Sequence, residues 1–271
     1  MGIVRLTAAV FALVTFGTTP TAAVTVYSIG NSLTFDATRN YAGNLEHTID
    51  CNRTLQRIFD NPATSCIESH PRHRDWSVAL TTKKYDYVTV QPWHNTTLDE
   101  NVATISEWMR LQPDAKFIVH TGWASRSIGS DRYSNALPNG GSFEHSEAFF
   151  GSLIERLEAL YPGRQVGSTN IIGTLNSIAV DIENSDSEID SLSSLYRDSV
   201  HFGLAGQYIA TNSLYRATGQ PFSPVNFESL PLATRQYLNA RIVDNVVAVP
   251  EPVCLVSFTF LAVFYAYRRN S

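Results

Sequence analysis

Charged residues are scarce in this sequence. Asp, Glu, Lys and Arg together make up only 17% of the 271 residues, the net charge is −5, and no run of basic residues occurs. Proteins that bind nucleic acid usually carry a basic patch or stripe, so we predict no nucleic-acid partner. Hydrophobic residues nevertheless make up 44% of the chain, which excludes intrinsic disorder.

Cysteine is scarce as well, with three residues in the whole chain, and no two of them form the CxxC pair of a zinc ribbon. Cys51 and Cys66 lie 15 residues apart. In an oxidising compartment they can form a disulfide, and their spacing alone leaves the bonded and the free state open. His70 and His73 stand among proline and arginine, which favours a solvated basic loop over a metal site.

Long apolar runs occur only at the two ends of the chain. Residues 1–23 combine Arg5, an apolar run from Leu6 to Phe16, and small residues that end at Ala23. This is the pattern of a secretory signal peptide, whose cleavage after Ala23 would start the mature chain at Val24. We therefore predict that the protein is exported.

Residues 250–271 form the second terminal segment. Pro250-Glu251-Pro252 precedes 15 uncharged residues, 253–267, and two arginines follow. This order resembles the PEP-CTERM sorting signal of certain Gram-negative bacteria, which an exosortase-type enzyme recognises. The resemblance implies a cell-surface, outer-envelope or secreted protein, an exosortase-type processing partner, and a transient or anchoring membrane contact through the tail. A plain C-terminal membrane anchor is the alternative.

Between the two ends, residues 24–249 read as one domain in which strand and helix patterns alternate. Such alternation predicts βαβ units and a three-layer α/β/α sandwich with a central, mainly parallel five-stranded sheet. The expected strands are 24–29, 55–59, 85–90, 116–120 and 165–172. The expected helices are 41–49, 76–82, 98–111, 143–161 and 205–217. In parallel sheets ligands bind at the carboxyl ends of the strands, where we look for chemistry.

Two short motifs lie toward the two ends of this domain. Gly30-Asn31-Ser32-Leu33 directly follows the first strand, and Asp198 stands three residues ahead of His201, just before the last expected helix. A serine hydroxyl becomes a good nucleophile only when a neighbouring base takes its proton. The base is normally a histidine that a carboxylate orients, and Asp198 and His201 fit these two roles.

Together the two motifs resemble the first and last blocks of the SGNH (GDSL-type) hydrolase family. The resemblance implies a flavodoxin-like fold and a catalytic triad of Ser32, His201 and Asp198. It also implies an oxyanion hole built from the Ser32 N–H and an asparagine side chain, for which Asn95 is the best candidate and Gln91 the alternative.

The family's second block supplies a glycine N–H to the oxyanion hole, but no glycine occurs between Gly43 and Gly122. We expect a backbone N–H from residues 65–69 in its place.

The resulting functional prediction is an exported serine esterase that hydrolyses carboxylic esters, with O-acetyl groups on carbohydrate as the expected substrate, and needs no metal or cofactor. Trp93 and Trp123 each follow a strand on the catalytic side and are either substrate contacts or core residues. Two other functions stay open: a lipase- or thioesterase-type hydrolase, and a non-catalytic surface or glycan-binding protein on the same scaffold.

Overall fold

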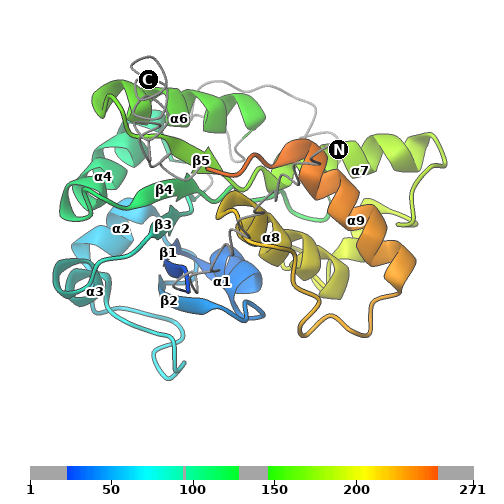
Figure 1. Ribbon diagram of the computed structural model, residues 1–271, viewed down its shortest axis with the longest axis horizontal. Coiled ribbons are helices and arrows are strands. Elements are labelled where there is room, and N and C mark those ends of the chain that lie inside the picture. The colour runs from blue at the N-terminus through cyan, green and yellow to red at the C-terminus, as the bar shows by residue number, and fades with distance from the viewer. Residues whose placement is uncertain (1–22, 94–95, 128–145, 250–271) are drawn as a thin grey trace, which may run out of the picture.

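The computed structural model describes residues 23–93, 96–127 and 146–249 (Figure 1). Five strands form one sheet in the order β2-β1-β3-β4-β5, and every neighbouring pair is parallel. The strands are β1 (Thr25–Gly30), β2 (Asn44–Ile49), β3 (Tyr87–Val90), β4 (Lys116–Val119) and β5 (Val166–Ser168). The predicted α/β fold with a five-stranded sheet is confirmed.

Helices cover both faces of the sheet, which makes the three layers (Figure 1). One layer consists of α2 (Leu55–Asp60), α3 (Trp76–Thr82), α4 (Leu98–Leu111) and α6 (Glu147–Leu160). The other consists of α1 (Ser32–Thr38), α7 (Ile171–Glu183), α8 (Leu204–Ala217) and α9 (Leu232–Asn245), with the short 3-10 helix η1 (Leu192–Leu195) beside α7 and α8. The strands between the layers are almost wholly buried, as parallel sheets require.

The segment 41–49, predicted as a helix, contains the strand β2 instead. Leu45 and Ile49 are both buried, and the interval of four residues between them fits one face of a helix and one face of a strand equally well. Tertiary pairing decides the outcome, because the whole of β2 lies in parallel register with β1.

The segment 55–59, predicted as a strand, is the helix α2. Thr54 caps it by accepting a hydrogen bond from the backbone N–H of Arg57 at 3.1 Å. Leu55 and Ile58 are buried while the residues between them are exposed, which is a helical spacing.

The predicted strand 165–172 is also shorter than expected. It ends at Ser168 because Asn170, in a left-handed conformation, caps the start of α7. The predicted helix 205–217 corresponds to α8, and α9 follows it.

The strand β2 lies at one edge of the sheet, and a loop covers its outer side. The backbone N–H of His47 donates to the carbonyl of Arg72 at 3.0 Å, and the N–H of Arg74 donates to the carbonyl of His47 at 3.0 Å. The loop that contains His70 and His73 thus blocks further strand pairing at this edge. Among the described residues, no group of three or more His, Cys, Asp or Glu side chains is arranged to hold a metal ion.

The two terminal segments lie outside the described residues, except for Ala23. Within the described ranges, no helix has both the length and the apolar character needed to cross a membrane. Val249, the last described residue, is buried, and its N–H donates to the carbonyl of Ala217 at 3.1 Å. The domain therefore remains packed up to the point where the predicted tail begins.

Candidate active site

Ser32 is the first residue of α1, directly beyond the carboxyl end of β1. Asn31 caps this helix, since its side-chain oxygen accepts a hydrogen bond from the N–H of Leu33 at 3.0 Å. The Ser32 N–H lies in the first turn, where backbone donors lack an intrahelical acceptor, so it is available to an oxyanion. Ser32 is partly buried, and its hydroxyl makes no hydrogen bond to another residue of the described ranges.

Gly30 allows β1 to turn tightly into α1. A Cβ atom at Gly30 would lie 2.1 Å from Oγ1 of Thr34 and 2.9 Å from Cβ of Gln91, so a larger residue would displace both side chains. These two neighbours also contact each other, because the Thr34 hydroxyl donates to Oε1 of Gln91 at 2.5 Å. The glycine of the first motif is therefore required by packing at the base of the site.

Asp198 and His201 lie in direct contact in the loop before α8. The Asp198 carboxylate oxygens lie 3.0 and 3.2 Å from Nδ1 of His201. One of these oxygens also accepts the backbone N–H groups of His201 at 2.8 Å and Val200 at 2.9 Å. These two backbone hydrogen bonds lower the pKa of Asp198 to about 2, and the bond from the His201 N–H has the largest effect.

An ionised carboxylate beside Nδ1 keeps the proton of a neutral imidazole on that nitrogen. The other ring nitrogen, Nε2, is then the one that can accept a proton from a substrate or a nucleophile. The local geometry of Asp198 and His201 is thus that of an acid–base pair.

A buried carboxylate ties this loop to the helix that begins with Ser32. Asp36, one turn along α1, is fully buried and accepts a hydrogen bond from Nη1 of Arg197 at 2.7 Å. Its second oxygen accepts the backbone N–H of Phe202 at 2.9 Å. Burial raises the pKa of Asp36, and the hydrogen bond from Arg197 opposes that shift.

Arg197 and Phe202 flank the Asp198–His201 segment on its two sides. Asp36 therefore fixes the position of the histidine loop relative to α1. Sequence reasoning missed this residue, because nothing local distinguishes it from a solvated carboxylate.

Trp123 supports the same loop from the side of β4. It is 6% exposed, its ring stacks on Phe202 with centroids 3.9 Å apart, and its indole N–H donates to the carbonyl of Val200 at 2.7 Å. Its flat face is therefore covered by protein, which assigns it to the core and to loop positioning. Trp93 is partly buried and precedes residues 94–95, which lie outside the described ranges.

Asn95, the predicted oxyanion side chain, lies outside the described residues. Gln91, the alternative, is buried beyond the end of β3, and the Thr34 hydroxyl binds the oxygen of its carboxamide. The amide nitrogen of Gln91 lies close to Gly122. Gln91 thus has a fixed orientation at the carboxyl edge of the sheet, next to the turn that carries Ser32.

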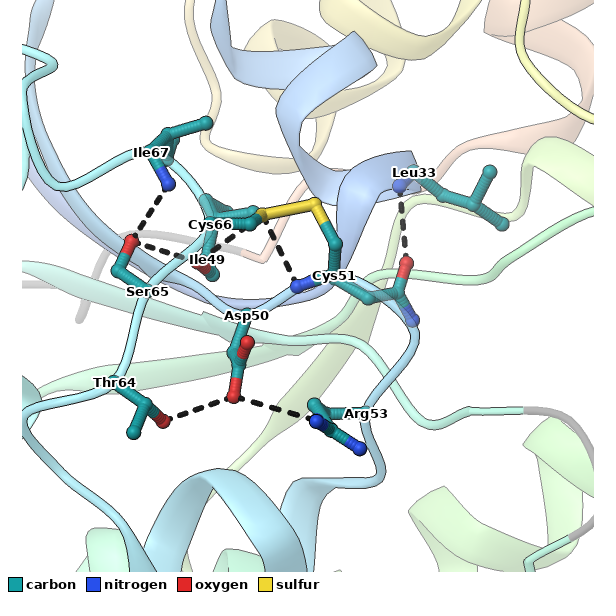
Figure 2. The surroundings of a disulfide bond; sticks show 10 residues. Leu33, Ile49, Asp50, Cys51, Arg53, Thr64, Ser65, Cys66 and Ile67 are labelled. Carbon is teal, nitrogen blue, oxygen red and sulfur yellow. Dashed lines mark hydrogen bonds and ion pairs between the residues drawn. A yellow bond between two sulfur atoms is a disulfide. The ribbon is translucent and has the colours of Figure 1, made fainter.

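The loop predicted to supply the second backbone donor is anchored by a disulfide. Cys51 and Cys66 are bonded, with Cα atoms 5.6 Å apart (Figure 2). The N–H of Cys66 donates to the carbonyl of Ile49 at 3.1 Å, and the N–H of Ile67 donates to the Ser65 hydroxyl at 3.1 Å. Two of the five N–H groups in residues 65–69 are therefore already engaged.

Comparisons with known proteins give distant structural similarity. No protein-family model matches the sequence, and no curated protein matches it. A structure described as a GDSL-like lipase from Parabacteroides merdae is 10% identical, with a TM-score of 0.46, over 73% of this chain and 96% of that one.

Two further structures are also distantly similar, with lower TM-scores. An acetyl xylan esterase from Butyrivibrio proteoclasticus is 9% identical, with a TM-score of 0.33, over 55% of this chain and 56% of that one. A phospholipase A1 from Streptomyces albidoflavus is 12% identical, with a TM-score of 0.38, over 71% of this chain and 98% of that one. Structural similarity at this level does not assign a reaction to the chain.

Proposed function

We propose that this protein is an exported serine esterase of the SGNH type. The observation that carries the proposal is the Asp198–His201 contact, in a loop that Asp36 ties to the helix beginning with Ser32. This contact supports the proposal, because α1 and the loop before α8 would then supply the serine, histidine and aspartate that nucleophilic acyl transfer requires.

In the proposed reaction, the Ser32 hydroxyl attacks the ester carbonyl while Nε2 of His201 takes its proton. The Ser32 N–H and an amide side chain, Asn95 or Gln91, stabilise the oxyanion of the tetrahedral intermediate. His201 returns the proton to the leaving alcohol, and an acyl–Ser32 ester remains. Water, activated by the same histidine, then attacks this ester and releases the acid. Asp198 orients the imidazole throughout and stabilises its protonated form.

The proposed substrate is an O-acetyl group on a carbohydrate at or outside the cell surface. The predicted signal peptide and sorting tail support export, and the Cys51–Cys66 disulfide fits an oxidising compartment. Residues 250–271 would engage the membrane and an exosortase-type enzyme.

Three variants of the purified protein test the mechanism with p-nitrophenyl acetate as substrate. Ser32→Ala and His201→Ala are expected to lower kcat/KM at least about 1000-fold. Asp198→Asn is expected to cost nearly as much if the carboxylate orients the imidazole, and far less if a backbone carbonyl does so in a Ser–His dyad. Wild-type rates in both Ser32→Ala and His201→Ala would refute the proposed catalytic residues, whereas no hydrolysis by the unsubstituted protein would refute the esterase and favour a binding protein.

A further inference from the structure

A polar pocket of about 240 Å³ lies beside the Cys51–Cys66 disulfide. It is formed by the turn after β2, one face of α2 and the loop that follows α2. Its lining includes Asp50, Arg53, Arg57, Asn61, Thr64 and Glu68. Its volume falls slightly below the roughly 300–1,000 Å³ of sites for drug-sized ligands, so its occupant is a smaller unit such as a single ring.

Backbone hydrogen bonds join the turn that lines this pocket to the end of β1, just before the predicted nucleophile. The N–H of Asp50 donates to the carbonyl of Gly30 at 3.0 Å, and Gly30 precedes Ser32 by two residues. On the opposite wall, the Ser65 hydroxyl donates at 2.8 Å to the carbonyl of Ile49, the residue paired with Gly30. Figure 2 shows the disulfide joining these two walls.

The pocket combines charges of both signs with neutral polar groups. Asp50 forms an ion pair with Arg53 at 3.8 Å, and the same carboxylate oxygen accepts the Thr64 hydroxyl at 2.9 Å. The guanidinium of Arg57 has no hydrogen bond or ion pair with any side chain of the described ranges, and Asn61 uses only its amide nitrogen, toward the Arg57 carbonyl at 2.9 Å. Among the described residues, the pocket therefore offers the free guanidinium of Arg57 as a donor, and the second carboxylate oxygen of Asp50 and the carboxamide oxygen of Asn61 as free acceptors.

Such a lining suits a ligand with several hydroxyl groups. Each hydroxyl both donates and accepts a hydrogen bond, so carboxylate, carboxamide and guanidinium groups can all engage one ring. Two cationic and two anionic side chains balance each other, so a strongly charged ligand would be attracted by one pair and repelled by the other.

We propose that this pocket binds the sugar ring that carries the ester. The proposal rests on the esterase function proposed above and gives the alcohol half of the substrate a location. The disulfide would then fix the width of the sugar subsite relative to Ser32, because it joins the pocket's two walls.

The test compares kcat/KM for partly acetylated xylo-oligosaccharides with kcat/KM for p-nitrophenyl acetate, which has no sugar ring. Arg57→Ala and Asn61→Ala are expected to lower the ratio of the two values about 10-fold, mainly through a higher KM for the oligosaccharide. Arg110→Ala, an exposed arginine at the end of α4, serves as the matched control and should leave the ratio unchanged. An unchanged ratio in both pocket variants would overturn the proposal.

A binding measurement separates failure of the pocket from failure of the enzyme. Saturation-transfer NMR should detect xylo-oligosaccharide on the Ser32→Ala protein and lose that signal in the Ser32→Ala/Arg57→Ala protein. Oligosaccharide binding that persists without Arg57 would refute the subsite even if hydrolysis depends on Ser32. Binding that requires Arg57 would support it even if Ser32→Ala retained full hydrolysis.

Discussion

Replacing Asp36 by asparagine tests whether its contacts position the loop that carries His201 in addition to stabilising the fold. Asp36 is fully buried, and its two oxygens accept hydrogen bonds from Nη1 of Arg197 at 2.7 Å and from the N–H of Phe202 at 2.9 Å. Asparagine keeps the shape of the side chain but removes its charge. Its NH2 group cannot accept a hydrogen bond, so it faces either the Arg197 guanidinium or the Phe202 N–H without forming one. The loop that carries His201 thereby loses one or both of its anchors to α1.

The expected loss of stability follows from the burial of the Asp36 carboxylate and its contact with Arg197. Removing one partner of a buried ion pair costs about 3–5 kcal/mol, because the other charge is left uncompensated. The Arg197 side chain is 39% exposed and can regain water, so we expect a loss near the lower limit, about 3 kcal/mol. A shift of about 1 Å in a catalytic group can lower the rate about 100-fold, and a similar fall in kcat is expected here.

The assay measures kcat with p-nitrophenyl acetate and the free energy of unfolding in urea for the same protein samples. Asp181→Asn is the matched control, because Asp181 pairs with Nε of Arg241 at 2.6 Å on helices that carry none of the predicted catalytic residues. The control should lose stability but keep its kcat. Equal kcat values in the Asp36 and Asp181 variants, corrected for the folded fraction, would refute the positioning role of Asp36.

Three further results are expected. Burial, aided for His47 by nearby histidines and arginine, lowers the pKa of His47 and His120 to about 3, so the unfolded chain binds protons below about pH 6.5 that the native state does not. The free energy of unfolding should therefore fall by roughly 4 kcal/mol between pH 7 and pH 5 in urea titrations, and an unchanged value would contradict this burial. The double variant Cys51→Ser/Cys66→Ser should lose about 3 kcal/mol in the same assay, as expected for a 15-residue loop, whereas an unchanged midpoint would show that the loop closes without the bond. Asn95→Ala should lower kcat roughly 100-fold or more, and a near-normal rate would assign the oxyanion amide to another side chain.

Local patterns in the sequence predicted contacts between residues that are close together along the chain. Asp198 and His201 are three residues apart, and one loop is enough to bring the carboxylate to Nδ1. Helix α4 was also predicted with its observed bounds from its regular apolar stripe, and the structure shows a capping box of Thr97 and Glu100 at its start.

Contacts between distant residues were not predictable in this way. Asp36 and Arg197 are separated by 161 residues, and only the folded chain shows that the carboxylate of this pair is fully buried. Trp123 likewise follows a strand, as a substrate contact would, but the sequence does not show that Phe202 covers its ring.

Short elements were the main source of error in the predicted secondary structure. A spacing of four residues, as between Leu45 and Ile49, fits the repeat of a helix and the repeat of a strand. Pairing with β1 selected the strand. In α2 the cap from Thr54 and packing against α4 overrode the β-like composition of the segment.

Covalent labelling of Ser32 tests the central claim most directly. A fluorophosphonate reacts with a serine whose hydroxyl is activated by a neighbouring base, and mass spectrometry locates the modified residue. The proposed mechanism predicts one adduct, on Ser32, which disappears in His201→Ala although Ser32 is still present. Wild-type protein that remains unlabelled, or labelled only at another residue while it still hydrolyses p-nitrophenyl acetate, would contradict the assignment of Ser32 as the nucleophile.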